Sequence, residues 1–334
     1  MKKLITLILF TVIAVSLTVC GSDASAAAER GTPVIAVVAR VIGQPWWDNV
    51  RDNGVAKWSQ EKGIEVIYKG PTGIDVEEQL QIMSDLVAQG VDIILLCPND
   101  SAAFENICRE ARERGIIIIT HEATGMQNID YNVEAFDEAG FGGFMMDHLA
   151  SMMGYEGEYI TMVGDMTTES HNNWADAAIA RQVEKYPNMT LVPDRRITSE
   201  YDAEIAYQKT KELLIKYPNL KGVQGTCSFD APGVARAVKE LGLAGRLHTI
   251  GATLPSEIRD FLREGVMQTG ALWDASITIQ AMLNLGMMMY NGETITTGID
   301  LGMPGYENVT VDGTLITGEG MLAITLDNVD DYSF

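Results

Sequence analysis

Short apolar runs alternate with amphipathic segments along the chain from residue 33 onward. The first run, PVIAVVARV (33–41), is rich in β-branched residues and is typical of a buried strand. Similar runs predict strands at 64–70, 91–98 and 115–123. The segments between them predict helices at 46–62, 75–90 and 101–114.

The same alternation starts again near Asp137. The second half predicts strands at 158–164, within 189–197, and at 220–227, 246–253 and 266–274. It predicts helices at 141–154, 173–186, 203–216, 232–241 and 277–290. A strand–helix unit that repeats about every thirty residues is typical of a parallel sheet covered by helices. We therefore expect an α/β protein with two doubly wound lobes joined by a hinge.

The order of the predicted elements divides the chain between these lobes. We expect residues 32–135 plus 274–300 in the N-terminal lobe and residues 136–273 in the C-terminal lobe. The tail, 301–334, is expected to run along both. Crossings of the chain near Glu134, Thr253 and Trp273 would form the hinge.

The N-terminus carries a different pattern. Lys2 and Lys3 precede an apolar stretch and then small residues, so residues 1–26 are predicted to be an export signal rather than a membrane anchor. Cleavage is expected after Ala26 or Ala28. The alternative is a lipid anchor at Cys20, because LTVC resembles a lipoprotein box apart from its valine. Either outcome places the chain in the periplasm or on the outer face of the cell membrane.

Composition narrows the classes of function. The net charge of −22 disfavours nucleic acid and anionic membranes as partners, because both would repel the chain. The odd number of cysteines after Cys20 predicts no disulfide framework. Cys97 and Cys108 could pair only if the fold brings them within reach, and we expect Cys97, Cys108 and Cys227 all to be small buried apolar residues. No G-x-G-x-x-G sequence follows the first strand, so a dinucleotide site is not expected.

Ligands of open α/β sheets bind beyond the carboxyl ends of the strands. The residues predicted to bind a ligand there are Arg40, Gln44, Trp46, Trp47, Glu122, Ser170, His171, Asn173, Thr226, Ser228, Thr253, Trp273 and Asp274. Aromatic rings stack on the C–H face of a sugar, and carboxylates, amides and a guanidinium suit its hydroxyls. The set therefore favours a small polyhydroxylated ligand.

Four segments resemble a known family. IAVVARVIGQPWW (35–47), QGVDIILLCPND (89–100), EGVMQTGALWD (264–274) and the terminal DYSF (331–334) are similar to tracts of the type I periplasmic binding proteins of sugar ABC transporters. The family is of the ribose-binding type, and the autoinducer-2 and rhamnose branch is the most similar part of it. The resemblance covers nearly the whole chain after the signal.

The resemblance implies a binding protein without enzyme activity or cofactor, expected to be a monomer. It would close its lobes on a monosaccharide, a deoxysugar or autoinducer-2 and deliver the ligand to a membrane permease. Arg40 stands where autoinducer-2 receptors have a lysine, and Glu122 stands on their ligand-binding aspartate. Ser170 and His171 stand near an Asp-Gln pair that is not preserved. Glu122-Ala123 replaces the Asp-Arg of ribose receptors, so ribose itself is not expected.

Several alternatives stay open at this point. Trp46 and Trp47 could cap the core, Arg40 could pair with Glu122, and Glu122 could hold a metal with His121 and His171, although hydrogen bonding is expected instead. A LacI-type repressor core has the same fold but needs a helix-turn-helix where the export signal stands. An enzyme is disfavoured because no Ser-His-Asp order or metal-ligand spacing is present. Sensing and import cannot be separated by sequence.

Overall fold

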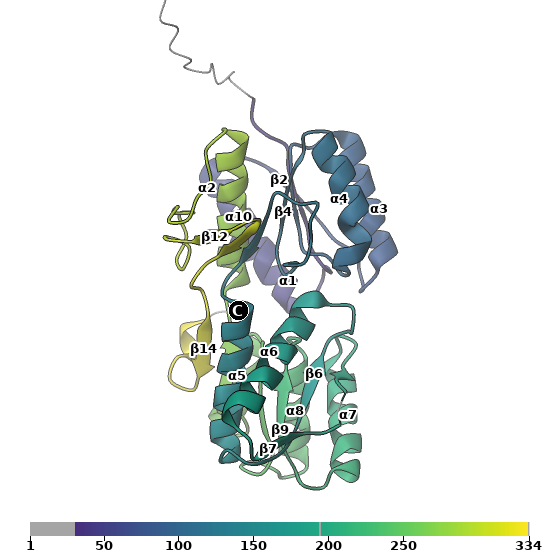
Figure 1. Cartoon of the computed structure of the whole chain (residues 1–334), viewed down its shortest axis with the longest axis vertical. Helices are drawn as coiled ribbons and strands as arrows, with labels where there is room; N and C mark the ends of the chain where they lie inside the picture. Colours follow the sequence, from purple (N-terminus) through teal and green to yellow (C-terminus); the bar gives the residue numbers. More distant parts are fainter. Residues whose placement is uncertain (1–30, 194, 333) are drawn as a thin grey trace, which may run out of the picture.

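The chain folds into two α/β lobes that are stacked along its long axis in the computed structural model (Figure 1). The structure describes residues 31–193, 195–332 and 334. The predicted export signal, 1–26, and the possible lipid anchor at Cys20 lie outside these residues. Within them, no helix combines the length and apolar character that a membrane crossing requires.

The first lobe is built on a seven-stranded sheet in the order β12-β13-β5-β4-β3-β1-β2, in which only β12 is antiparallel to its neighbour. Its strands are β1 (Ile35–Val38), β2 (Val66–Lys69), β3 (Ile93–Leu96), β4 (Ile117–Thr120), β5 (Tyr131–Glu134), β12 (Thr310–Asp312) and β13 (Leu315–Thr317). Its helical segments are α1 (Pro45–Asn49), the π-helical η1 (Val50–Val55), α2 (Ala56–Lys62), α3 (Val76–Gln89), α4 (Ser101–Glu113) and α10 (Ala275–Tyr290).

The second lobe is built on a smaller, fully parallel sheet in the order β10-β9-β6-β7, with β8 beside β6. Its strands are β6 (Gly157–Val163), β7 (Met189–Leu191), β8 (Ile197–Thr198), β9 (Leu220–Gly225) and β10 (His248–Gly251). Its helices are α5 (Glu138–Met153), α6 (Glu169–Lys185), α7 (Ala203–Lys216), α8 (Asp230–Glu240) and α9 (Pro255–Arg263). The expected α/β class with two doubly wound lobes is confirmed.

The periodicity of the sequence explains these elements. All four residues of β1 and of β3 are buried, as expected for central strands of a sheet with helices on both faces. Asp75 caps the N-terminus of helix α3 by accepting a hydrogen bond from the Glu78 amide, and Gly90, with a φ of 70°, caps its C-terminus. The predicted strand–helix alternation is therefore realised through ordinary burial and capping.

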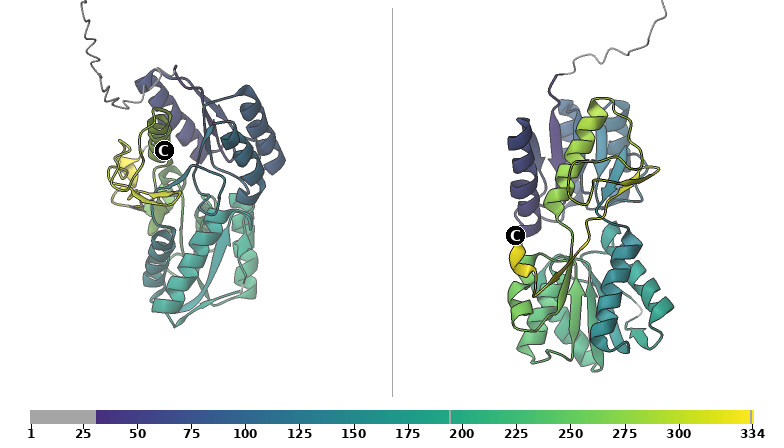
Figure 2. Two further views of the ribbon diagram at one scale, coloured as in Figure 1. Left: turned by 45° about the horizontal axis from the view of Figure 1, so that its top comes forward. Right: turned by 90° about the vertical axis from the view of Figure 1, so that its left-hand side faces the viewer.

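Three connections join the lobes. The chain passes between them at 135–137, at 273–274 and at 318–321, in each case between a strand and the element that follows it. A third crossing near Thr253 was predicted, and this prediction is wrong, because β10 and α9 on either side of Thr253 both belong to the second lobe. The tail makes this crossing instead, as the right-hand view of Figure 2 shows.

The tail contributes strands that the sequence did not predict. After β12 and β13 have extended the first sheet, β14 (Leu322–Thr325) pairs antiparallel with β11 (Thr269–Leu272) in a separate two-stranded sheet. The short 3-10 helix η2 (Val329–Asp331) then packs on α9, where Arg259 donates to the Tyr332 carbonyl at 2.6 Å.

Two predicted helices differ from the observed ones. The helix expected at 46–62 forms, but η1 interrupts it where α10 crosses; a Cβ at Gly54 would lie 2.4 Å from the Ile279 side chain. The helix expected from Asn173 begins four residues earlier, at Glu169. Ser170 and His171 therefore lie on its first turn and not in a loop.

The three cysteines of the described chain, Cys97, Cys108 and Cys227, are free and buried. This confirms the expectation that they act as small apolar residues of the core.

Candidate functional site

Each sheet has one position where the direction of strand succession reverses. In the first sheet this position lies between β1 and β3, and in the second between β6 and β9. The loops that follow these strands form the crevice in which doubly wound proteins bind ligands. In this chain the two crevices face each other across the junction of the lobes and enclose one cavity.

We call this space the interlobe cavity. Its volume is about 40 Å³, which is room for a few water molecules. Its lining residues are Arg40, Gln44, Trp46, Trp47, Glu122, His171, Trp174, Tyr201, Thr226, Cys227, Ser228, Ala252 and Trp273. They come from both lobes and from the connection between β11 and α10.

Arg40 and Glu122 form a buried ion pair at the first-lobe side of the cavity. The Arg40 Nη1 donates to Glu122 Oε2 at 2.9 Å, and its Nε donates to the Pro98 carbonyl at 3.2 Å. Burial raises the pKa of Glu122, but the Arg40 charge, together with the nearby histidines and the Ser170 hydrogen bond, more than offsets it and lowers the pKa to about 2. Both charges are therefore present at neutral pH and compensate each other.

The turn that presents Glu122 is held by β5. Glu122 has a φ of 56°, a conformation unfavourable for residues other than glycine. Its amide donates to Glu134 Oε1 at 2.8 Å, and the amide of Ala123 donates to Asn132 Oδ1 at 3.2 Å. Asn132 in turn donates to Glu134 Oε1 at 2.7 Å. These bonds fix the carboxylate at the end of β4 and offset the backbone strain.

His121 is held by the same carboxylate. Its Nδ1 lies 3.2 Å from Glu134 Oε2 and 2.7 Å from the Val133 carbonyl. Burial lowers the pKa of His121, but the charge and hydrogen bond of Glu134, together with the Glu122 charge and the Val133 carbonyl, more than offset it and raise the pKa to about 9. His121 and Glu134 thus form a second buried ion pair, next to the first, in which the two charges compensate each other.

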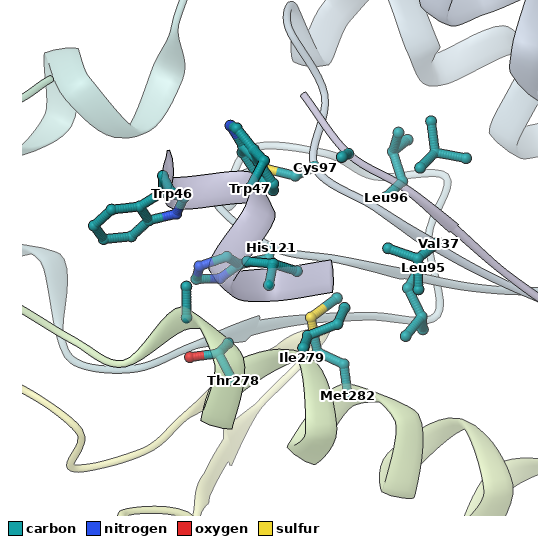
Figure 3. A pocket seen from close by; sticks show the side chains of 14 residues that line it. Val37, Trp46, Trp47, Leu95, Leu96, Cys97, His121, Thr278, Ile279 and Met282 are labelled. Carbon is teal, nitrogen blue, oxygen red and sulfur yellow. The ribbon is translucent and has the colours of Figure 1, made fainter. Parts of the chain in front are cut away.

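Trp46 and Trp47 stand between two cavities. Both line the interlobe cavity, and both also close one end of a mainly apolar cavity inside the first lobe, where Ile279 and Met282 of α10 lie opposite (Figure 3). Their side chains are almost fully buried, at 8% and 9% exposed. The two indoles therefore cap the core of the first lobe and form a wall of the interlobe cavity at the same time.

Trp273 links the aromatic residues of the two lobes. Its ring meets Trp46 edge-on at a centroid distance of 4.8 Å and meets Trp174 of α6 at 5.3 Å. Phe136 and Phe141 lie 5.2 and 5.8 Å from it. Since Trp273 lies on a connection between the lobes, a change in their relative position would move this cluster.

The second lobe contributes a neutral histidine. His171 Nδ1 accepts from the Gly164 amide at 3.3 Å, so the ring proton is assigned to Nε2. Burial and the nearby Arg40 charge lower the pKa of His171 to about 3. The adjacent Ser170 hydroxyl donates to Glu122 Oε2 at 2.7 Å and joins α6 directly to the first lobe.

The loop after β9 supplies the remaining polar wall. The amides of Thr226 and Cys227 donate to the Asp230 carboxylate at 3.0 and 2.9 Å, which fixes the turn that also carries Ser228. The Thr226 hydroxyl donates to the Met162 carbonyl at 3.2 Å. The loop therefore presents a rigid surface to the cavity.

Nine of the thirteen predicted ligand-binding residues line the interlobe cavity: Arg40, Gln44, Trp46, Trp47, Glu122, His171, Thr226, Ser228 and Trp273. The other four lie outside this lining and are Ser170, Asn173, Thr253 and Asp274. Ser170 reaches Glu122, whereas the other three have structural partners.

These three residues form hydrogen bonds within the protein. Asn173 donates to Glu138 Oε2 at 3.0 Å, and the Thr253 hydroxyl donates to the Ser228 carbonyl at 3.1 Å. Asp274 caps α10 by accepting from the Ser276 amide at 2.9 Å. Thr253 and Asp274 follow strands, as the sequence indicated, but their side chains turn to the second lobe and to α10. Asn173 lies within α6, and its side chain also donates to Thr124 of the first lobe at 3.4 Å.

Four lining residues were not among the predicted ones: Trp174, Tyr201, Cys227 and Ala252. Trp174 follows Ser170 by one helical turn, so an earlier helix start would have placed it beside the cavity. Thr168 followed by Glu169 was the available signal for that start. Tyr201 follows the two-residue strand β8, which is too short to predict from periodicity.

The described residues hold no group of three or more His, Cys, Asp or Glu side chains that could bind a metal ion. His121 is turned to Glu134 and His171 to the backbone, which separates the histidines from a shared centre.

Known proteins share this architecture. The D-allose-binding periplasmic protein of Escherichia coli K12 is 26% identical over 258 residues, covering 74% of this chain and 79% of that protein. The xylitol-binding protein of Mycolicibacterium smegmatis is 22% identical over 302 residues, covering 90% and 84%. The curated relatives are therefore matched over most of their length.

Solved structures give the same fold. LsrB from Clostridium saccharobutylicum, in complex with AI-2, matches with a TM-score of 0.81 at 18% identity and covers 90% of this chain and all of that chain. A solute-binding protein of Clostridium phytofermentas with bound L-rhamnose matches with a TM-score of 0.81 at 20% identity, covering 90% and 98%. The family model described as a periplasmic binding protein domain matches residues 35–294. The chain thus belongs to the periplasmic binding protein family.

Proposed function

We propose that this protein is the extracytoplasmic solute-binding component of a sugar ABC transporter. It takes up a small neutral sugar between its lobes and delivers it to a membrane permease, without enzyme activity. One observation carries the proposal. The loops at the strand-order reversals of both sheets line a single cavity, and Trp46, Trp273 and the Arg40–Glu122 pair are part of its lining.

The balance of charge favours an uncharged ligand. Arg40 is neutralised by Glu122, and His121 is neutralised by Glu134. His171 is neutral because its pKa is lowered to about 3. A sugar acid would bring a buried carboxylate without an unpaired cation to meet it, and burying such a charge is costly. A neutral sugar avoids this cost and can use its hydroxyls at the carboxylate and guanidinium.

Binding requires the lobes to separate. The interlobe cavity of about 40 Å³ is too small for a sugar ring, and the Ser170–Glu122 hydrogen bond joins the two lobes beside it. We propose that the lobes, 32–135 with 274–300 and 136–273, open about the hinge and that a sugar hydroxyl takes over the Ser170 contact as they close. Closure then covers the tryptophans and excludes water.

The relatives support this class of ligand. Their names specify D-allose, xylitol and ribose, and the rhamnose complex adds a deoxysugar. The complex of LsrB with AI-2 makes a signal-binding role the alternative. Export through residues 1–26, or anchoring at Cys20, and a monomeric state belong to this proposal.

The test is a ligand panel on the purified exported chain. Thermal shift and calorimetry would compare D-allose, L-rhamnose, D-ribose, xylitol and autoinducer-2 with glucuronate and glucosamine. We expect one neutral sugar or polyol to raise the melting temperature by mass action and the charged sugars to have no effect. A response confined to glucuronate or glucosamine, or no response to any of these ligands, would overturn the proposal, and a response to autoinducer-2 alone would favour the signalling alternative.

A further inference from the structure

Trp174 has a hydrogen-bond donor that the protein does not use. Its side chain is 1% exposed and lines the interlobe cavity, and its indole Nε1 finds no acceptor anywhere in the described chain. A buried N–H group without a partner is rare in native proteins and costs free energy. This cost needs an explanation.

The same sequence pairs such a donor elsewhere. Trp58, also 1% exposed, donates its indole N–H to Asn284 Oδ1 at 2.8 Å in the first lobe. At Trp58, where no ligand is expected, a side-chain amide of the protein therefore supplies the acceptor that the indole of Trp174 lacks. At Trp174 the surroundings are aromatic, with Phe136, Phe141 and Trp273 at centroid distances of 5.9, 5.1 and 5.3 Å.

The indole of Trp174 cannot readily turn to another acceptor. Rings pack against it from α5, from the β5–α5 connection and from the β11–α10 connection, and His171 lies 5.8 Å away on its own helix. Its backbone is fixed as well, because α5 approaches so closely that a Cβ on Gly142 would lie 2.4 Å from the Trp174 carbonyl oxygen. The donor is therefore pre-organised.

Two further donors of the cavity lining are in the same condition. Arg40 Nη2 and Trp273 Nε1 are buried and have no acceptor among residues 31–193, 195–332 and 334. Sugar oxygens can accept such bonds through their lone pairs without bringing a charge. The cavity lining thus has more hydrogen-bond donors than the protein has acceptors for them. A ligand rich in oxygen atoms would supply the acceptors.

We infer that Trp174 is a ligand-binding residue whose indole N–H donates a hydrogen bond to an oxygen atom of the bound sugar. This inference rests on the proposed function and adds a specificity-determining residue to it. The ligand must present an acceptor on the α6 side of the cavity, so that a sugar deoxygenated at that one position binds more weakly.

The experiment compares Trp174→Phe with Trp58→Phe, using the sugar that the wild-type protein binds in the panel. Trp174→Phe keeps an aromatic ring and removes the donor; we expect the affinity to fall about 3- to 10-fold, as for the loss of one neutral hydrogen bond. The smaller ring leaves a cavity, so the melting temperature of the ligand-free protein should fall, but by less than in Trp58→Phe, which also loses a hydrogen bond. Trp58→Phe should lower the melting temperature and leave the affinity unchanged.

A second measurement uses the unmodified protein. The wild type has five tryptophans, and the indole N–H resonance of Trp174 should shift downfield on sugar addition while that of Trp58 stays in place. Unchanged affinity of Trp174→Phe, or an unmoved Trp174 resonance in a protein that binds sugar, would overturn the inference alone. If the wild type binds no sugar at all, the proposed function fails and the inference fails with it.

Discussion

At the scale of single residues, the site is organised by compensated charges. Arg40 and Glu122 are 3% and 4% exposed and depend on each other, and His121 depends on Glu134. A buried pair of this kind adds little net stability, but removing one partner leaves a buried charge without compensation. Replacing one residue of an ion pair therefore tests whether the two charges compensate each other in the folded protein.

Glu122→Gln should destabilise the ligand-free protein strongly. The substitution keeps the shape of the side chain but leaves the Arg40 charge buried, which costs about 3–5 kcal/mol. Urea denaturation would measure the free energy of unfolding. Glu184→Gln is the control, because Glu184 is 61% exposed and solvent screens its pair with Lys185, so this substitution should change the free energy of unfolding little. Similar losses in both variants would contradict the prediction.

His121 should make stability depend on pH in the alkaline range. Its pKa is raised in the folded protein, to about 9 from an ordinary value near 6.5, so its stabilising contribution is complete below about pH 6.5 and is lost as the pH rises through 9. The melting temperature should fall between these limits. In His121→Gln this fall should flatten, and an identical pH profile in both proteins would refute the assignment.

Glu122 should make the stability of the protein fall as the pH becomes acidic, whereas His121 makes it fall as the pH becomes alkaline. Its folded pKa of about 2 lies below the ordinary carboxyl value near 4.3, so its contribution is present above that value and is lost as the pH falls towards 2. Acid titration of the melting temperature should show a steeper fall below pH 4.3 in the wild type than in Glu122→Gln. Parallel curves would indicate that the pair with Arg40 does not stabilise the fold.

At the scale of elements, the packing of α5 on α6 positions the second-lobe side of the cavity. Gly142 brings the helices together at Trp174, and α6 carries Ser170 and His171 on its first turn. Because α5 and α6 are packed closely, a shift of α5 would also move the first turn of α6 at the cavity. The distance between α5 and α6 is therefore part of the site geometry.

Gly142→Ala should destabilise the protein while Gly143→Ala should not. A Cβ at Gly142 would lie 2.4 Å from the Trp174 carbonyl oxygen and force the helices apart, at a cost of about 1–3 kcal/mol. At Gly143 the nearest atom is 3.9 Å away, so alanine should gain about 0.5–1 kcal/mol from helix propensity. Chemical denaturation of both variants decides this, and a destabilised Gly143→Ala with an unaffected Gly142→Ala would reverse the conclusion.

At the scale of the whole molecule, the lobes are held together by bonds outside the cavity as well as by three connections. Glu169 on α6 accepts from the Thr124 hydroxyl at 3.1 Å and from the Gly125 amide of the first lobe. The Thr124 hydroxyl also donates to Glu138 at 3.3 Å and accepts from Asn173 at 3.4 Å. These bonds exist only when the lobes are close, so they favour the closed conformation, in which the ligand is held after it has entered.

Glu169→Ala should weaken ligand binding without touching the cavity. Loss of a hydrogen bond from the closed state raises its free energy by about 1 kcal/mol, which reduces affinity about fivefold. Calorimetry measures the affinity, and small-angle scattering should show a larger radius of gyration before ligand is added. Glu156→Ala is the control, since Glu156 pairs with Lys221 at 3.0 Å within the second lobe and should leave both quantities unchanged.

Much of the site could be predicted because it depends on where strands end. The carboxyl ends of β1 and β4 place Arg40 and Glu122 at one edge of the sheet, and the same rule applies to Thr226 after β9. The rule does not specify where a side chain points. Asp274 also follows a strand, yet it caps α10, because its carboxylate lies closest to the free amides of that helix.

The sequence by itself determined the alternation of strands and helices, the α/β class and the family, since periodicity and turn residues are local properties. Only the tertiary structure decided that Arg40 and Glu122 pair with each other, that the tail makes the third crossing, and that Trp174 joins the cavity lining. Each of these depends on contacts between residues far apart in the chain. Such contacts are selected by the packing of whole elements, which no local pattern records.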